Sequence, residues 1–301
     1  ARRTSRRWMR YATSRSELAY NPNNNINRLT IMKLLHTTAC LVVAAFMVAC
    51  SNEEPAPKPN LRPDLPGSTE THIRSVVHSG SIEGSYDWEF EYVDERLVGA
   101  KGSLYNPTSH EVEYTSQLTY TPDNVTIANS GDLQMNVTLD ENNCIETLTV
   151  NKDEYRFFYA DGRLIAWEKT LKDINFGAEA LHARGAIEYK DGDIATITYS
   201  ENNDDPTYYH CTPSSLYNTN GLLPETLSKQ MGCFGFEHLY YAGLLGKATK
   251  HLVHAIQIDF PEEAKREDYQ IEFSYSTNRE EQTELCTYNI NGEAASVNYT
   301  Y

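Results

Sequence analysis

Short runs of aromatic and aliphatic residues, mixed with polar ones, alternate along this chain with tight-turn sequences. The clearest unit is Tyr155–Trp167, in which two such runs flank the pair Asp161-Gly162. Asp-Gly tolerates the positive φ angles of a type I′ turn, so the unit predicts a β-hairpin. Neighbouring strand residues point to opposite faces, which separates Phe157 from Phe158. Aromatic residues on both faces predict that both are at least half covered.

The unit recurs with changes in its polar positions. Residues 90–97 repeat it with Glu95 at the place of the turn glycine, which predicts a looser turn. Residues 187–194 repeat it with Asp193 at the place of the arginine. Weaker copies occur at 137–145 and 288–292. The spacings differ from copy to copy, which indicates a meander of hairpins and not a solenoid of fixed period.

The fold expected for residues 72–301 is mainly β, an antiparallel meander of repeated hairpins that closes into a barrel-like sheet. The first strands are expected at Ile73–Ser79 and Trp88–Val93. A long meander must protect its edges, and closure is the commonest way to do so. An open, strongly curved sheet is the alternative. The 21 tyrosines of the sequence fit strands, since tyrosine favours them and tolerates one wet end.

One short helix is expected within residues 237–250. In Glu237–Lys247, Tyr240 lies four residues before Leu244, and Gly246 would cap the end. The segment is apolar around much of its circumference, which predicts burial across the concave face of the sheet or in the barrel mouth. The irregular stretch 200–236 precedes it. We expect any binding site around these two segments.

The first part of the chain is interpreted as a targeting sequence. Residues 32–49 resemble a bacterial lipoprotein signal peptide, with Cys50 at the lipidated position. Their apolar run, 34–48, is shorter than the roughly 20 residues of a spanning helix, which is the alternative reading. Residues 1–31 are interpreted as an upstream segment from a misassigned start. Residues 50–71 predict a lipidated cysteine, carrying palmitate-type acyl chains, followed by a proline-rich tether.

The residues after Cys50 refine the expected location. The position after Cys50 is a serine, and not the aspartate that marks inner-membrane retention in many Gram-negative bacteria. Glu53 and Glu54 resemble the surface-export signal of Bacteroidetes lipoproteins. The expected localisation is the outer membrane, with a lipid anchor and exposure at the cell surface.

The lipoprotein start, the Tyr-x-Asp-Gly-Arg-Leu hairpins and the stretch 240–250 together resemble the Bacteroidales lipoprotein family called domain of unknown function 4595. The resemblance covers residues 72–301 and implies a porin-like fold. The family has no assigned activity, so it implies no catalytic residue. The predicted outer face is too polar for the lipid-facing band of a membrane barrel, so the resemblance concerns strand arrangement alone.

Charge and motifs narrow the function classes. The net charge is −16, and the residues after position 49 are more acidic still, with 18 basic and 41 acidic side chains. Such an acidic surface disfavours nucleic acid as a partner. The sequence has no nucleophile elbow, zinc-protease motif, phosphate loop or dinucleotide fingerprint, so we expect no enzyme and no cofactor. His210, His251 and His254 lack the spacing of a metal site.

Four cysteines remain after Cys50 and the signal segment, at positions 144, 211, 233 and 286. None has CxxC spacing, so neither a zinc knuckle nor a redox motif is expected. A disulfide between Cys211 and Cys233 would staple the irregular stretch. Four free, buried thiols are the alternative.

Aromatic side chains are the candidate ligand-binding residues, because they stack on sugar rings. The candidates are Trp88, Trp167, Tyr208, Tyr209, Tyr240 and Tyr241. The function expected is a binding or interaction module of the envelope, for a glycan or a partner protein. A hydrolase of extracellular polymer and a purely structural envelope protein are the alternatives.

Overall fold

The computed structural model describes residues 72–80, 84–106, 109–121, 124–172, 179–202 and 204–301. All of them belong to one compact unit of the chain. The segments expected as upstream region, signal peptide and tether, including Cys50, lie outside these residues. Within the described part, no helix is long and apolar enough to cross a membrane.

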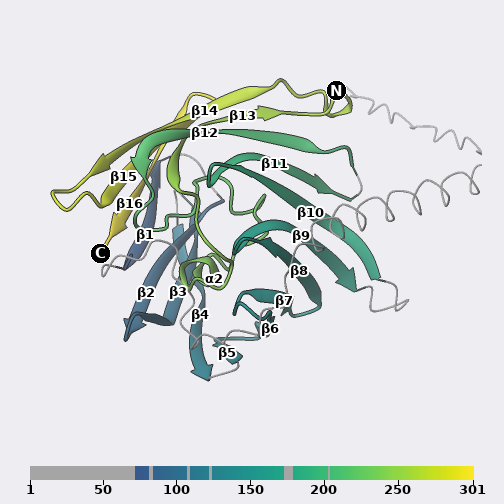
Figure 1. Cartoon of the computed structure of the whole chain (residues 1–301), viewed down its shortest axis with the longest axis vertical. Coiled ribbons are helices and arrows are strands. Elements are labelled where there is room, and N and C mark those ends of the chain that lie inside the picture. Colours follow the sequence, from purple (N-terminus) through teal and green to yellow (C-terminus); the bar gives the residue numbers. More distant parts are fainter. Residues whose placement is uncertain (1–71, 81–83, 107–108, 122–123, 173–178, 203) are drawn as a thin grey trace, which may run out of the picture. The chain divides into compact units, whose positions relative to one another are not determined.

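Sixteen strands form one antiparallel sheet (Figure 1). They are β1 (Ser75–Gly80), β2 (Tyr86–Val93), β3 (Arg96–Asn106), β4 (Ser109–Thr121), β5 (Asn124–Asn129), β6 (Met135–Leu139), β7 (Ile145–Val150), β8 (Asp153–Ala160), β9 (Arg163–Lys172), β10 (Glu179–Lys190), β11 (Asp193–Glu201), β12 (Thr207–Tyr217), β13 (His251–Asp259), β14 (Tyr269–Thr277), β15 (Thr283–Ile290) and β16 (Glu293–Thr300). A 3-10 helix, η1 (Glu262–Ala264), joins β13 to β14.

Neighbouring strands in the sequence are neighbours in the sheet, with one break. The spatial order runs from β5 back to β1, passes to β16, and continues back to β6. The first and last strands therefore pair, with Ser75 opposite Thr300 and Gly80 opposite Ala295. The two edges, β5 and β6, are consecutive in the chain. The expectation of a mainly β meander that closes into a barrel-like sheet is confirmed, and the barrel is nearly closed.

The pleat of the sheet separates a buried inner face from a polar outer face. On β14, Ile271 and Phe273 are buried while Gln270 and Glu272 are exposed. This is the pattern of a sheet with one face on a core and the other in water. On β8, Phe157 points inward and is 3% exposed, whereas Phe158 points outward and is 45% exposed, so the outer face is about half covered at this residue.

The Asp161-Gly162 turn has the predicted conformation, whereas the prediction of a looser turn at Glu95 is wrong. Asp161 and Gly162 have φ values of 52° and 72°, as a type I′ turn requires. Asp94 and Glu95 have φ values of 49° and 65°, so the turn without glycine is as tight as the others. The flanking residues pair directly in both hairpins: Ala160 with Arg163, and Val93 with Arg96.

Residues 218–250, which we call the plug, leave the sheet between β12 and β13 and fill the space inside it (Figure 1). Most of their side chains are buried, among them Leu227, Leu239 and Leu244 with no exposed surface. The plug carries a single α-helical turn, α2 (His238–Tyr241). The stretch before it is less irregular than expected, because β12 occupies Thr207–Tyr217.

The helix in the plug is shorter than the predicted Glu237–Lys247 because Gly243 ends it. Gly243 has a φ of 76°, and its amide bonds the carbonyl of Tyr240 at 2.9 Å. The amide of Leu244 bonds the carbonyl of Leu239 at 3.0 Å. These two bonds form the glycine-based cap that reverses a helix end. Tyr240 and Leu244 therefore do not form a helical pair.

Candidate functional site

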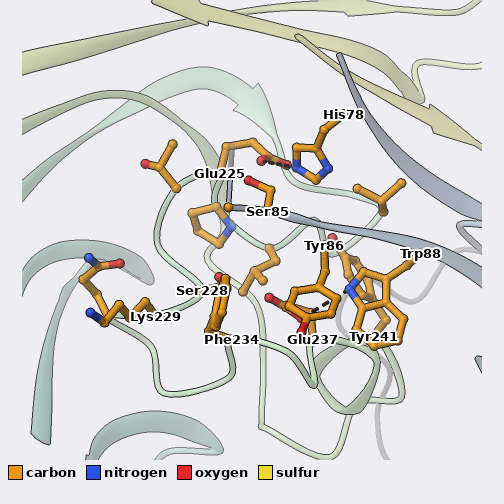
Figure 2. A pocket seen from close by; sticks show the side chains of 16 residues that line it. His78, Ser85, Tyr86, Trp88, Glu225, Ser228, Lys229, Phe234, Glu237 and Tyr241 are labelled. Atoms are coloured by element: carbon orange, nitrogen blue, oxygen red, sulfur yellow. Dashed lines mark hydrogen bonds and ion pairs between the residues drawn. The ribbon is translucent and has the colours of Figure 1, made fainter. Parts of the chain in front are cut away.

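A cavity of about 420 Å³ lies between the plug and strands β1 and β2 (Figure 2). Strand alternation turns Val76 and His78 of β1, and Tyr86 and Trp88 of β2, toward the inside of the barrel. The plug supplies the opposite wall. This volume falls within the range of small-molecule sites, roughly 300–1,000 Å³.

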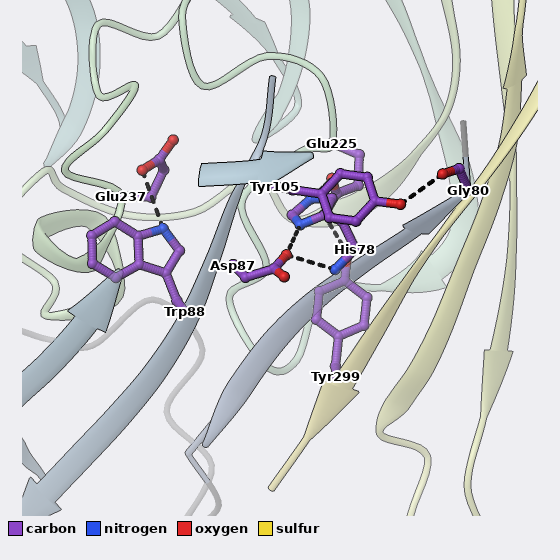
Figure 3. Close-up of polar contacts among 8 residues, drawn as sticks. All are labelled: His78, Gly80, Asp87, Trp88, Tyr105, Glu225, Glu237 and Tyr299. Atoms are coloured by element: carbon purple, nitrogen blue, oxygen red, sulfur yellow. Dashed lines mark hydrogen bonds and ion pairs between the residues drawn. The ribbon is translucent and has the colours of Figure 1, made fainter. Parts of the chain in front are cut away.

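One wall of the cavity holds a buried charge cluster (Figure 3). His78 Nδ1 lies 2.9 Å from Asp87 Oδ1, and its Nε2 lies 3.4 Å from Oε2 of Glu225 in the plug. Burial by itself lowers the pKa of His78. The hydrogen bonds and charges of the two carboxylates outweigh it and raise that pKa to about 9. His78 is thus a fixed imidazolium between two carboxylates, which leaves it no free nitrogen for work as a general base.

Glu225 is held on both oxygens. Its Oε2 faces His78, and its Oε1 accepts a hydrogen bond of 2.6 Å from the Tyr299 hydroxyl of β16. The residue therefore joins the plug to strands at the closure of the sheet. Its carboxylate oxygens keep lone pairs for further donors, because a carboxylate accepts about four hydrogen bonds.

Glu237 is the second buried carboxylate on the cavity. Its Oε2 accepts hydrogen bonds from the Trp88 indole Nε1 at 3.2 Å and from the Gly235 amide at 3.0 Å. Within the described part of the chain, no Lys, Arg or His forms an ion pair with it. Burial raises the pKa of Glu237 to about 7, although these hydrogen bonds oppose the rise. Glu237 is thus poised between a neutral acid and a carboxylate near neutral pH.

An aromatic pair borders the cavity. Tyr86 on β2 meets Phe234 of the plug edge to face, with 5.3 Å between the ring centroids. Phe234 is 40% exposed, an unusual state for phenylalanine, whereas Trp88 is 2% exposed. Trp88 stacks behind Tyr86 at 5.9 Å. The exposed part of this aromatic surface is therefore formed by Tyr86 and Phe234.

Lys229, the remaining basic residue of the cavity wall, is already engaged. Its Nζ lies 2.9 Å from Glu201 Oε1 on β11 and 5.6 Å from the centre of the Tyr199 ring. In Figure 2, it lies on the side of the cavity away from Trp88. Its charge thus neutralises Glu201 and not Glu237.

The plug is anchored at its other end by the hairpin turns. The amides of Lys247 and Lys250 donate to the carbonyls of Gly162 and Gly192, at 2.8 and 3.1 Å. Asp193 accepts from the amide of His251 at 2.6 Å and faces its Nδ1 at 2.8 Å. These bonds fix the backbone at residues 247–251, where the chain passes from the plug into β13. We therefore assign the contacts of Asp193 and His251 a structural role.

The six aromatic candidates do not form one site. Trp88 and Tyr241 line the cavity but are buried, and Tyr240 is buried behind them. Trp167 is buried and donates to the Gln230 carbonyl at 2.7 Å. On β12, Tyr208 is exposed, while the Tyr209 hydroxyl accepts a hydrogen bond of 3.0 Å from Gln230 Nε2 of the plug. The candidates are thus divided between the core, the cavity wall and the outer face.

The structure does not join Cys211 to Cys233, and both thiols are free, as are Cys144 and Cys286. Cys211 lies on β12, and Cys233 is buried in the plug, where its thiol faces the Ser228 carbonyl at 3.4 Å. In the described residues, no group of three or more His, Cys, Asp or Glu is arranged to hold a metal ion.

Sequence reasoning missed five residues of the cavity: His78, Tyr86, Glu225, Phe234 and Glu237. Their partners are far apart in the chain: Glu225 lies 147 positions after His78, and Glu237 lies 149 positions after Trp88. The available signal was a pair of glutamates in a stretch rich in apolar residues, since buried carboxylates are rare without a special reason.

Comparisons with known proteins agree with this architecture. The similar solved structures include two that are described as porin-like proteins. That from Bacteroides uniformis ATCC 8492 has a TM-score of 0.58 at 16% identity, covering 76% of this chain and 98% of that one. That from Bacteroides vulgatus ATCC 8482 has a TM-score of 0.50 at 10% identity, covering 77% and 99%. At these identities the likeness shows the fold alone.

No curated protein matches the chain. The family model described as "Domain of unknown function (DUF4595) with porin-like fold" matches residues 98–283, more than half of the 301 residues. The match spans β3 to the start of β15, including the whole plug. The chain therefore belongs to this family of domains of unknown function with a porin-like fold.

Proposed function

We propose that this chain is a glycan-binding module of the cell envelope, and that the glycan binds in the cavity between the plug and strands β1 and β2. The observation that carries the proposal is the pair of half-buried Tyr86 and exposed Phe234 beside the buried carboxylates of Glu225 and Glu237. An aromatic face packs against the apolar face of a sugar ring, and carboxylates accept hydrogen bonds from its hydroxyls.

Rigidity supports binding at this place. Glu225 is held by His78 and Tyr299, and Glu237 by Trp88 and Gly235. Acceptors fixed before the ligand arrives lose little conformational entropy on binding. The site therefore has the preorganised polar groups and the apolar surface that small-molecule sites combine.

The test is binding of the full chain to a glycan array, followed by calorimetry with each hit. Phe234→Ala removes an exposed ring and is expected to weaken binding at least tenfold. Tyr217→Ala is the matched control, because Tyr217 is 63% exposed on β12 away from the cavity, and its affinity should equal that of the wild type. Absence of any glycan hit, or equal binding by F234A, would overturn the proposal.

The location proposed for this module is the outer membrane, with a lipid anchor on Cys50 and the domain facing outward. It is supported by the signal-like residues 32–49, the cysteine and the acidic pair that follows it. Labelling cells with radioactive palmitate should mark the wild type and not Cys50→Ser. Protease added to intact cells should remove the domain. Survival of the domain in intact cells would place it on the inner side.

A hydrolase of extracellular polymer is the second candidate, because Glu237 has the near-neutral pKa of a general acid. Both oxygens of Glu225 already accept hydrogen bonds, which suits it to orienting a ligand and not to attacking one. Incubating each bound glycan with the wild type and with Glu237→Gln separates the two functions. New reducing ends from the wild type alone would establish hydrolysis, and intact glycan would establish binding.

A further inference from the structure

The cavity holds one buried carboxylate, that of Glu237, for which the described residues provide no cation. Asp87, Glu225 and Glu237 border it or support it, and His78 is the cation that faces the first two. Lys229 is paired with Glu201. Among the described residues, Glu237 thus has neutral donors only, which compensate a buried carboxylate less well than a cation does.

The groups around Glu237 are aromatic rings and neutral polar side chains. From β2 come Tyr86 and the Trp88 indole, whose ring also lies 4.9 Å from that of His238. Burial lowers the pKa of His238 to about 3, so this neighbour adds no positive charge. From β4, Tyr114 bonds the carbonyl of Gly235. A cation placed beside Glu237 would meet a carboxylate and the aromatic surface at once.

A neutral ligand would leave this imbalance in place. Sugar hydroxyls would donate hydrogen bonds to Glu237 but would not cancel its charge. An ammonium would donate three hydrogen bonds, neutralise the carboxylate and be attracted to the aromatic faces of Tyr86 and Phe234. Such cation–π attraction strengthens where water is excluded.

We propose that the ligand of this cavity is a glycan with a free amino group, whose ammonium binds Glu237 against Tyr86 and Phe234. This inference rests on the proposed function and specifies its ligand class. Free amino sugars and other amine-bearing saccharides share the required chemistry. Their acetylated forms keep the ring and lose the charge, which makes them the natural comparison.

The experiment compares three trisaccharides with the same β-1,4 backbone, built from glucosamine, N-acetylglucosamine and glucose. Each is titrated calorimetrically into the full chain at low salt and at pH 7, where about half of a carboxyl with a pKa of about 7 is ionised. The amine form is expected to bind at least tenfold more tightly than either neutral form. In Glu237→Gln this preference should disappear, because the amide keeps the shape and the acceptor oxygen but carries no charge.

Glu188→Gln is the matched control, since Glu188 is exposed on the outer face of β10, and it should retain the preference. Equal binding of the three sugars to the wild type, with loss in F234A, would overturn the amine inference and leave the proposed function standing. No binding of these or of any arrayed glycan would overturn both. The preference within the wild type decides the question even where E237Q folds poorly.

Discussion

The hydroxyl of Tyr299, on the last strand, donates a hydrogen bond of 2.6 Å to Oε1 of Glu225 in the plug. Both side chains are buried, and β16, which carries Tyr299, pairs with β1. This hydrogen bond thus connects the strands at which the sheet closes to the plug. The stability of the closed barrel and the position of the cavity wall consequently depend on each other.

Tyr299→Phe should destabilise the domain by about 1–3 kcal/mol, because it leaves a buried carboxylate oxygen without its donor. The measurement is the free energy of unfolding from denaturant titration at pH 7. Tyr208→Phe is the control, since Tyr208 is exposed on β12, and its effect should stay within about 0.5 kcal/mol. Equal effects of the two variants would show that the bond to Glu225 contributes nothing.

The charge cluster predicts a loss of stability with rising pH. Its carboxylates raise the pKa of His78 to about 9, above the ordinary 6.5. A raised pKa means that the folded protein holds the proton more tightly than the unfolded chain. The contribution is therefore complete below about pH 6.5 and is lost as the pH rises through about 9.

We expect the wild type to lose on the order of 2–3 kcal/mol more than His78→Gln across this window. His254→Gln, at an exposed position of β13, should follow the wild type. Stability curves of H78Q and the wild type that run parallel from pH 6.5 to 9 would contradict the assignment.

The raised pKa of Glu237 also predicts a loss of stability with rising pH, in a lower pH range than that of His78. Burial raises its pKa from 4.5 to about 7, so folding is favoured by the protonated form. Its contribution is present below about pH 4.5 and is lost as the pH rises through about 7. Glu237→Gln should therefore be more stable than the wild type at pH 8, on the order of 2–3 kcal/mol, and similar at pH 4.5.

Thermal and denaturant unfolding of E237Q at these two pH values checks this, with Glu188→Gln as the control. A variant that gains stability while losing ligand preference would identify Glu237 as a residue kept for binding at the expense of stability. A destabilised E237Q at pH 8 would mean that its carboxylate is compensated by the fold itself.

Two glycines of β3 differ in what surrounds them. A Cβ at Gly102 would lie 2.7 Å from the Trp88 ring, whereas one at Gly99 would meet the end of the Glu91 side chain at 3.1 Å. Gly102→Ala should therefore cost about 1–3 kcal/mol and displace Trp88 from Glu237. Gly99→Ala should cost less, because a flexible side chain can move. Tryptophan fluorescence and unfolding free energies distinguish the two outcomes.

The turn at Glu95 offers a gain in stability. Glu95 has a φ of 65°, in the left-handed region that costs a residue with a side chain roughly 1–2 kcal/mol. Glu95→Gly should relieve part of this cost and raise the melting temperature. Gly292→Glu makes the reverse change at the matching turn position, where a Cβ meets nothing within 4 Å, and should lower it. Shifts of the same sign in both variants would contradict the argument.

Local chemistry made the hairpins predictable. The pairs Asp161-Gly162 and Asp191-Gly192 favour a two-residue turn with positive φ values. Such a turn predicts a strand on each side. The same local logic misjudged Glu95, because strand pairing on both sides of the turn imposes a conformation that its own preference would not select. It also overextended the helix, since Tyr240 and Leu244 suggest a continuing face while Gly243 turns the backbone.

The cavity was out of reach for a different reason. Glu225 and Glu237 acquire meaning only when the plug enters the barrel and meets His78 and Trp88, residues separated from them by most of the domain. Burial of the plug was foreseeable from its apolar composition. The wall of the barrel that the plug contacts was not foreseeable, because it depends on the pairing of β1 with β16.

The pairing of β1 with β16 also means that the order of the strands along the chain is one of several that would give the same sheet. The strand ends Ser75 and Thr300 are opposite one another, while the sheet is interrupted between Asn129 and Met135. A circular permutant could join the end of β16 to the start of β1 and begin at β6. Its chain would then run from the edge strand β6 to the edge strand β5 as an uninterrupted meander. Where a chain starts and where its barrel opens are thus independent choices in this architecture.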